Sequence, residues 1–167
     1  VAENGALALV PRAGGLDTLY QQDAATRAEN FMRMQAVLAQ IEASVPGARR
    51  ARDSAGRETD IAIDHSEFTQ LPAAAIAQVQ DLMQAQGMRA TVSSIHINGW
   101  YGEHDKFSGA CWIARALWGC ELRAELERWV YVGDSSNDQV MFQHFPHSVG
   151  VANIRRFESQ LSHRSEE

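Results

Sequence analysis

The sequence has few of the residues that would tie it to a disulfide framework or a membrane. Its two cysteines, Cys111 and Cys120, are nine positions apart, a spacing that predicts neither a zinc pair nor a disulfide framework. We therefore expect buried free thiols and a reducing, cytoplasmic location. No apolar run is long enough to span a bilayer, and no basic, apolar signal segment opens the chain. The sequence therefore predicts no membrane partner.

Positive charge is also scarce. Fifteen lysines and arginines against 21 aspartates and glutamates give a formal net charge of -6 at pH 7. Binding a nucleic acid requires clustered positive charge, so we predict no nucleic-acid partner. Apolar residues are plentiful at 45%. The 167 residues are enough for one domain, or for one domain and a fragment of another.

The first hundred residues predict a small α/β domain. Helices are expected where apolar residues recur at helical spacing, and strands where they alternate or are β-branched. The expected elements are a loop at Pro11 to Asp17, helices at Ala24 to Ala43 and Ala73 to Gln86, strands flanking a turn at Asp53 to Gly56, a strand at Arg89 to Ile97 and a hairpin turn at Asn98-Gly99. His96 lies on the last of these strands, where a structural role is favoured over a catalytic one.

Oxygen ligands follow the most clearly predicted strand. Trp129 to Val132 is a short β-branched and aromatic run, typical of a buried strand. Asp134 comes just after it, at the strand end where α/β sheets bind ligands. Asn137 and Asp138 lie one helical turn further along, on the same side. Such a group suits a hard cation such as Mg²⁺, although an ordinary helix cap with solvated acids is the alternative.

Lys106 and a patch of four arginines are candidates for binding an anion. Lys106 opens a helical segment, where its charge opposes the helix dipole, and a nearby anion would explain that position. A snorkelling surface lysine is the alternative. The dense basic patch of the chain consists of Arg49, Arg50, Arg52 and Arg57. Guanidinium groups match phosphate and carboxylate geometry, but a solvated hairpin is the other interpretation.

Four segments resemble motifs of haloacid-dehalogenase-type (HAD) phosphatases. Gly133 to Asp138 resembles the fourth motif, and Ser148 to Asn153 the strand that follows it. Asp105-Lys106 resembles the third motif. The opening Val1 to Ala6 resembles the strand that leads into the cap of subclass IIB, the group of Cof-like, sucrose-phosphate and mannosyl-3-phosphoglycerate phosphatases.

The resemblance implies an α/β fold. It would be the C-terminal part of a HAD Rossmann-like core, a parallel sheet with helices, plus an inserted α/β cap domain of the C2B type. Residues 1–7 would form a core strand leading into the cap, residues 8–98 the cap, and residues 99–167 the C-terminal part of the core.

The resemblance also implies a Mg²⁺-dependent phosphatase that hydrolyses a small phosphorylated metabolite, a sugar phosphate. Asp134 would bind the metal directly. Asp138 would be a catalytic residue in the metal's outer shell, where it would orient ligands or pair with Lys106. The catalytic Lys106 would also neutralise the phosphoryl oxygens. Asn137 would hold the substrate phosphate or a metal-bound water, and Arg57 would bind the substrate.

One departure from the family pattern changes what this chain is expected to do. The nucleophile of these enzymes comes from an Asp-x-Asp motif, which occurs nowhere in the 167 residues. We therefore expect an N-terminally truncated chain that is inactive alone, with the aspartate that becomes phosphorylated in a missing segment or in a separate N-terminal fragment of the same protein. The alternatives are a phosphohexomutase of the same superfamily and a non-catalytic module that binds sugar phosphates.

Overall fold

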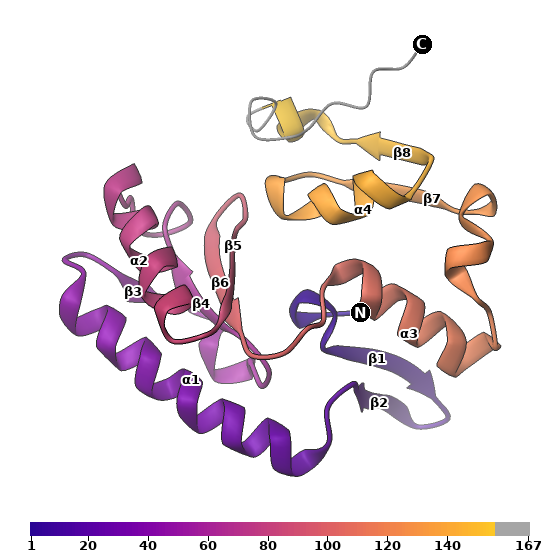
Figure 1. Ribbon diagram of the computed structural model, residues 1–167, viewed down its shortest axis with the longest axis horizontal. Coiled ribbons are helices and arrows are strands. Elements are labelled where there is room, and N and C mark those ends of the chain that lie inside the picture. Colours follow the sequence, from indigo (N-terminus) through magenta and orange to yellow (C-terminus); the bar gives the residue numbers. More distant parts are fainter. Residues whose placement is uncertain (156–167) are drawn as a thin grey trace. The chain divides into compact units, whose positions relative to one another are not determined.

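The computed structural model describes residues 1–155, which form two compact units (Figure 1). The first combines Val1–Gln21 with the described part of His104–Glu167, and the second is Gln22–Glu103. The units therefore change at residues 21/22 and 103/104, whereas the sequence placed the domain changes at 7/8 and 98/99. The assignment of the middle unit as a cap stays a prediction.

The first unit contains an antiparallel hairpin, a parallel strand pair and two α-helices. Its elements are the turn η1 (Glu3–Gly5), strands β1 (Leu7–Arg12) and β2 (Gly15–Tyr20), helix α3 (Lys106–Trp118), the short turns η3 (Leu122–Ala124) and η4 (Leu126–Arg128), strand β7 (Val130–Gly133), the turn η5 (Ser136–Asp138), helix α4 (Gln139–His144) and strand β8 (His147–Gly150). The β7–β8 pair is parallel, as expected for a Rossmann-like core, and its strand β7 leads directly into the acidic turn.

The first twenty residues differ from the sequence-based expectation in two ways. Residues Pro11 to Asp17 are not a loop, because the strands pair along their whole length, from Leu7 opposite Tyr20 to Arg12 opposite Gly15. Gly14, with φ of 98°, supplies the left-handed residue that lets the chain reverse in so short a turn. Residues 1–7 are likewise interrupted by the turn η1 and do not form a continuous strand.

The second unit is a four-stranded antiparallel sheet with two helices on one face (Figure 1). Its elements are helix α1 (Ala24–Ser44), strand β3 (Arg49–Arg50), the turn η2 (Ser54–Gly56), strand β4 (Ile61–Asp64), helix α2 (Ala73–Ala85), and strands β5 (Arg89–Val92) and β6 (His96–Trp100). The strand order is β3-β4-β6-β5. The core between sheet and helices includes Leu38 and Ile41 of α1, Val79 and Met83 of α2, and Ile61, Ile63 and Ile97 of the sheet.

The opposite face of this sheet is polar. Side chains alternate between the two faces of a strand, so the neighbours of the core isoleucines point away from the helices. These neighbours include Asp64, His96 and Asn98, which are all buried. Thr91 is paired with Asn98 across β5 and β6. The unit therefore has an apolar face packed against its helices and an opposite face that carries buried polar side chains.

The Asn98-Gly99 pair is not the predicted hairpin turn. Both residues lie inside β6, and the chain turns earlier, at Ser93 to Ile95. The Ser93 hydroxyl stabilises that turn by accepting the backbone N–H of His96 at 3.0 Å. Gly99 is needed within the strand because a Cβ there would lie 2.7 Å from the sulfur of Met83. The glycine thus marks the close packing of α2 on β6.

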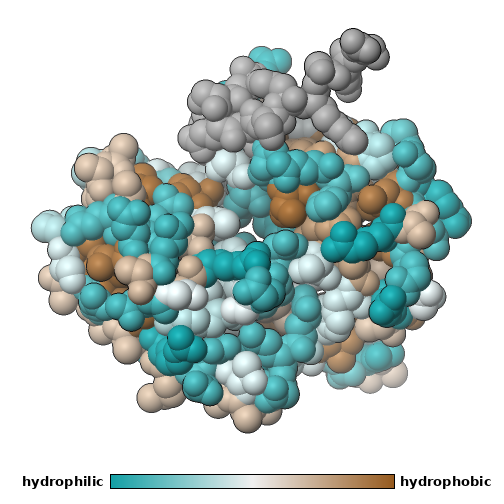
Figure 2. Space-filling view, viewed as in Figure 1, coloured by the Kyte–Doolittle hydropathy of each residue, from teal (hydrophilic) through white to brown (hydrophobic). Residues whose placement is uncertain are grey.

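Among residues 1–155, none of the helices has the length and apolarity that crossing a bilayer requires. Hydrophobic and hydrophilic residues are interspersed on the face shown in Figure 2. The larger exposed hydrophobic side chains of the first unit include Val130, Val132 and Val149 of the β7–β8 pair.

Two glycines bring η1 against the start of α3. A Cβ on Gly109 would lie 2.5 Å from the Cα of Gly5, and one on Gly5 would lie 2.1 Å from the backbone oxygen of Asp105. Gly5 also has φ of 100°, in the left-handed region. The Gln21 side chain donates a 2.8 Å hydrogen bond to the Gly5 carbonyl and holds the same turn. The glycine contact therefore fixes the first turn of α3, which carries Lys106.

Replacing Gly109 by alanine should reverse the usual effect of such a change. A glycine-to-alanine change inside a helix normally stabilises it, but here the added Cβ would overlap the backbone of Gly5. We expect the free energy of unfolding to fall by about 1–3 kcal/mol in a urea titration. The matched control is Gly15→Ala, where a Cβ would meet no atom within 4 Å. Equal stability of the two variants would contradict the close contact.

Candidate active site

Lys106 is the first residue of α3 and the only lysine in the sequence. The helix begins at Asp105, whose carboxylate accepts the backbone N–H of Ser108 at 2.7 Å, while the Ser108 hydroxyl accepts the Asp105 N–H at 2.8 Å. This reciprocal cap fixes the helix start in spite of the lysine's unfavourable charge there. The Lys106 ammonium donates to Asp138 Oδ1 at 2.5 Å and to Asn137 Oδ1 at 3.1 Å.

Asp138 is the most heavily hydrogen-bonded side chain of the site. Its Oδ1 accepts the Lys106 ammonium and the Tyr131 hydroxyl, the latter at 2.7 Å. Its Oδ2 accepts the backbone N–H groups of Asp134 at 2.8 Å and Ser135 at 3.2 Å. A carboxylate offers about four acceptor positions, so this set uses them all. Asp138 is thus occupied by protein donors and is poorly suited to bind a metal directly.

The ionisation of this group follows from its contacts. Burial by itself would raise the pKa of Asp138, but the hydrogen bonds from Lys106 and Tyr131 outweigh it and hold the pKa below its usual value. Burial and the hydrogen bond to Asp138 together raise the pKa of Tyr131 far above the usual range. The site therefore contains an ionised aspartate, and a tyrosine that remains a hydrogen-bond donor at neutral pH.

Asp134 is the less occupied carboxylate. The Asn153 amide donates to its Oδ2 at 2.9 Å, which holds the side chain at the carboxyl end of β7. Asn137 accepts both the Lys106 ammonium and the Ser135 hydroxyl through its Oδ1. In residues 1–155 no three His, Cys, Asp or Glu side chains lie close enough to hold a metal ion by themselves. A metal at Asp134 would need further oxygen ligands from elsewhere.

A cavity of about 310 Å³ adjoins this group. Lys106 and Tyr131 line one part of it, and the turn η1 with Asn4 lines another. Glu3 and Asn4 are the non-glycine residues of the described chain that have positive φ, 46° and 54°. The left-handed residues Glu3 and Asn4 thus form one wall of the cavity, and the Lys106 ammonium lies on another.

Arg57 lies in the second unit and is paired with acids. Its guanidinium donates to Asp60 at 2.7 Å and to Asp53 at 2.7 and 3.0 Å. Burial alone would lower the pKa of Arg57, but the hydrogen bonds and charges of Asp53 and Asp60 raise it. The two carboxylates therefore balance the charge of Arg57. That Arg57 binds the substrate stays a prediction.

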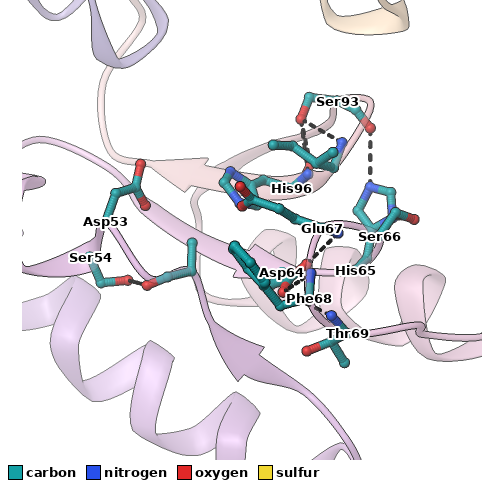
Figure 3. Close-up of polar contacts among 12 residues, drawn as sticks. Asp53, Ser54, Asp64, His65, Ser66, Glu67, Phe68, Thr69, Ser93 and His96 are labelled. Atoms are coloured by element: carbon teal, nitrogen blue, oxygen red, sulfur yellow. Dashed lines mark hydrogen bonds and ion pairs between the residues drawn. The ribbon is translucent and has the colours of Figure 1, made fainter.

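The polar groups of the second unit gather around Asp64 (Figure 3). The Asp64 carboxylate accepts three backbone N–H groups, from Glu67 at 2.9 Å, Phe68 at 2.9 Å and Thr69 at 3.0 Å. His96 Nε2 lies 3.0 Å from the Glu67 carboxylate, in agreement with the structural role expected for this histidine. Asp64 therefore fixes the loop after β4, and this loop supplies the partner of His96.

Sequence reasoning missed two members of the first unit's site. Tyr131 and Asn153 were noted only as parts of strands, yet their side chains contact Asp138 and Asp134. For Tyr131 a signal existed: a polar aromatic residue between the valines of a core strand requires a hydrogen-bond partner. For Asn153 the residue type gave no signal, because only the fold brings the end of β8 beside the β7 turn.

Comparison with known proteins supports the fold and leaves the activity open. No family model and no curated protein matches the chain. Among solved structures, it is similar to the sucrose-phosphatase of Synechocystis sp. PCC6803 in complex with sucrose and phosphate, with a TM-score of 0.63 and 19% identity over 90% of this chain and 57% of the other.

Two further structures are similar at lower scores. One is a trehalose-6-phosphate phosphatase related protein, with a TM-score of 0.50 and 14% identity over 80% of this chain and 53% of the other. The second is the C-terminal domain of the C. albicans trehalose-6-phosphate phosphatase, with a TM-score of 0.50 and 10% identity over 81% and 49%. The chain thus spans about half the length of these structures. The predicted α/β fold is confirmed: the chain shares the fold of these solved phosphatase structures.

Asp64 should make stability depend on pH. Burial would raise the pKa of Asp64, but its three backbone N–H partners hold it below its ordinary value of 3.8. Because the folded-state pKa is depressed, the stabilisation is present above the unfolded pKa and is lost as the pH falls through the folded one. We expect Asp64→Asn to lower the free energy of unfolding by about 1–3 kcal/mol at neutral pH, since the amide leaves N–H donors unpaired.

The measurement is the difference in unfolding free energy between the wild type and Asp64→Asn. It should shrink between about pH 5 and pH 2, because only the wild type has a titratable carboxylate at position 64. The control is Asp81→Asn on the exposed side of α2, which should show a small difference at every pH. A constant difference for Asp64→Asn would contradict the assignment.

Proposed function

We propose that the protein is a Mg²⁺-dependent phosphatase that hydrolyses a small phosphorylated metabolite, a sugar phosphate. The observation that carries this proposal is the placement of the only lysine, which lies at a cavity wall and is bound to Asn137 and Asp138. The shared fold with sugar-phosphate phosphatases supports it. A cytoplasmic location stays a prediction.

In this proposal Lys106 neutralises the charge of the transferred phosphoryl group. Two of its three N–H donors have partners in the described part of the chain, Asp138 and Asn137. The third remains for a phosphate oxygen. Because Asp138 is ionised and buried beside it, the ammonium is held in position, which is the preorganised electrostatic stabilisation on which phosphoryl transfer depends. Asn137 can offer its amide N–H groups to the same phosphate.

The donor chemistry at the β7 turn fits Mg²⁺ at Asp134. A hard cation takes one or two protein carboxylates and completes its shell with water and phosphate oxygens, and Asp134 retains an oxygen beyond its contact with Asn153. Asp138 does not fit as a direct ligand, since protein donors occupy both its oxygens; instead it orients the turn that carries Asp134. When bound, the ion would neutralise charge on the phosphate and help to position it.

The nucleophile would come from polypeptide beyond these 167 residues, which contain no Asp-x-Asp pair. The exposed face of the β7–β8 pair supports this origin of the nucleophile. Parallel sheets of α/β proteins are normally covered on both faces, whereas Val130, Val132 and Val149 are 65%, 56% and 51% exposed. We propose that an N-terminal segment, in the same chain or as a separate fragment, covers these valines and supplies the aspartate that is phosphorylated and then hydrolysed.

The second unit, as the predicted cap, would contribute to the choice of substrate. Its polar sheet face contains the buried Asn98 Oδ1 and Thr91 Oγ1, which have no hydrogen-bond partner among the described residues. Buried polar atoms normally have partners. Arg57 would contribute less as an anion ligand than as the residue that holds Asp53 and Asp60.

Asp134→Asn in the whole protein should abolish Mg²⁺-dependent phosphate release from sugar phosphates. The amide loses the negative charge on which the cation depends, and we expect kcat/KM to fall about a hundredfold or more. Release of inorganic phosphate is measured against Mg²⁺ concentration, with Asp81→Asn as the matched control. Unchanged turnover by Asp134→Asn would contradict the assignment.

The same assay separates the two alternatives. A phosphohexomutase would convert one hexose phosphate into another and require a bisphosphate activator, so product analysis would show an isomer in place of free phosphate. A binding module would bind sugar phosphate without Mg²⁺ and release none. The absence of an Asp-x-Asp pair from the 167 residues keeps the second alternative open.

A further inference from the structure

Tyr131 is held rigidly beside the candidate site. It lies in β7 between Val130 and Val132, whose side chains are exposed, so its own side chain points to the other face of the strand. There its ring packs on Phe142 and Phe145, with centroid separations of 5.5 and 5.7 Å. This packing leaves the hydroxyl little freedom and directs it toward one acceptor.

That acceptor is the oxygen that also binds the lysine. The Tyr131 hydroxyl donates to Asp138 Oδ1 at 2.7 Å, and the Lys106 ammonium donates to the same atom at 2.5 Å. The second oxygen of Asp138 is occupied by two backbone N–H groups. Tyr131 thus supplies the contact that completes the set of four donors and fixes the rotation of the carboxylate. It also lines the 310 Å³ cavity with Lys106.

A fixed carboxylate matters because a lysine side chain is flexible. Holding it in one rotamer costs conformational entropy, and a loosely held ammonium would present its N–H groups in many directions. With Asp138 immobilised, two N–H groups are directed to Asp138 and Asn137, and the direction of the third is determined. We propose that Tyr131 is a positioning residue whose hydroxyl fixes Asp138, and through it Lys106, so that one ammonium N–H is presented to a phosphate oxygen. This inference rests on the proposed function.

The unique lysine allows a direct test. Lysine labelled with ¹³C at Cε and ¹⁵N at Nζ should give one side-chain NMR signal from the 167-residue chain, and that signal reports the surroundings of Lys106. Tyr131→Phe keeps the ring and removes only the hydroxyl. We expect it to shift the Nζ signal, to speed proton exchange of the ammonium with water, and to raise the apparent Kd for inorganic phosphate about three- to tenfold.

Two further variants separate positioning from packing. Phe142→Leu removes one of the two aromatic neighbours of Tyr131 but keeps Phe145 and the hydroxyl, so it should lower stability and shift the Lys106 signal less than Tyr131→Phe does. In an Asp138→Asn background, Tyr131→Phe should cause much less additional shift, since the two changes interrupt one chain of contacts. Circular dichroism confirms that each variant is folded.

Each result bears on the proposal. An unchanged Lys106 signal in Tyr131→Phe, or an equal shift in Phe142→Leu, would overturn the positioning role. Full additivity with Asp138→Asn would overturn it as well. If the wild-type chain binds no phosphate, that result counts against the proposed function, while the lysine signal still decides whether Tyr131 positions Lys106.

Discussion

The carboxylate of Asp138 is the constraint on which the first unit's site depends. It joins the start of α3 through Lys106, the strand β7 through Tyr131, and the turn after β7 through two backbone N–H groups. Its side chain is only 4% exposed. A buried charge is tolerated only when it is fully paired and hydrogen-bonded. The three elements must therefore meet in one arrangement, and that arrangement places the lysine at the cavity.

This constraint also separates the tasks of the two aspartates in the turn. Asp138 is occupied by protein donors, so its charge serves Lys106 and the shape of the turn. Within residues 1–155, Asp134 accepts one side-chain hydrogen bond, from Asn153, and it keeps capacity for a ligand from outside the chain. Two acids four positions apart thus differ in chemistry because the backbone directs the turn's N–H groups to only one of them. Spacing alone does not reveal this difference.

The parts of the fold that were predictable have local causes. The helices α1 and α2 follow from apolar spacing, and the segment from Gly133 to Asp138 from its strand, glycine and acids. Less predictable were the features set by contacts distant in sequence. Gly99 resembles a turn residue until Met83 is seen against it, and Tyr131 resembles an ordinary strand residue until the fold places its hydroxyl on Asp138. The roles assigned to Lys106, Asp134, Asn137 and Asp138 stay predictions.

The arginine patch shows why charge density in a sequence is a weak guide to an anion site. Arg49, Arg50, Arg52 and Arg57 are dense in the sequence, but each has a partner: the Ala48 carbonyl, the Glu42 carboxylate, the Phe68 ring, and the acids Asp53 and Asp60. Arg50 and Arg57 are paired with carboxylates, which repel an added phosphate and weaken its attraction to these two arginines.

Lys106 is also paired with an acid, yet its case differs. Asp138 is almost completely buried, while the lysine side chain remains 31% exposed and lines a cavity. An incoming phosphate would therefore meet the ammonium from the open side, with the balancing carboxylate behind it and hydrogen-bonded to Tyr131 and to two backbone N–H groups. What distinguishes an anion site from a structural ion pair here is which partner is exposed, and this depends on the fold.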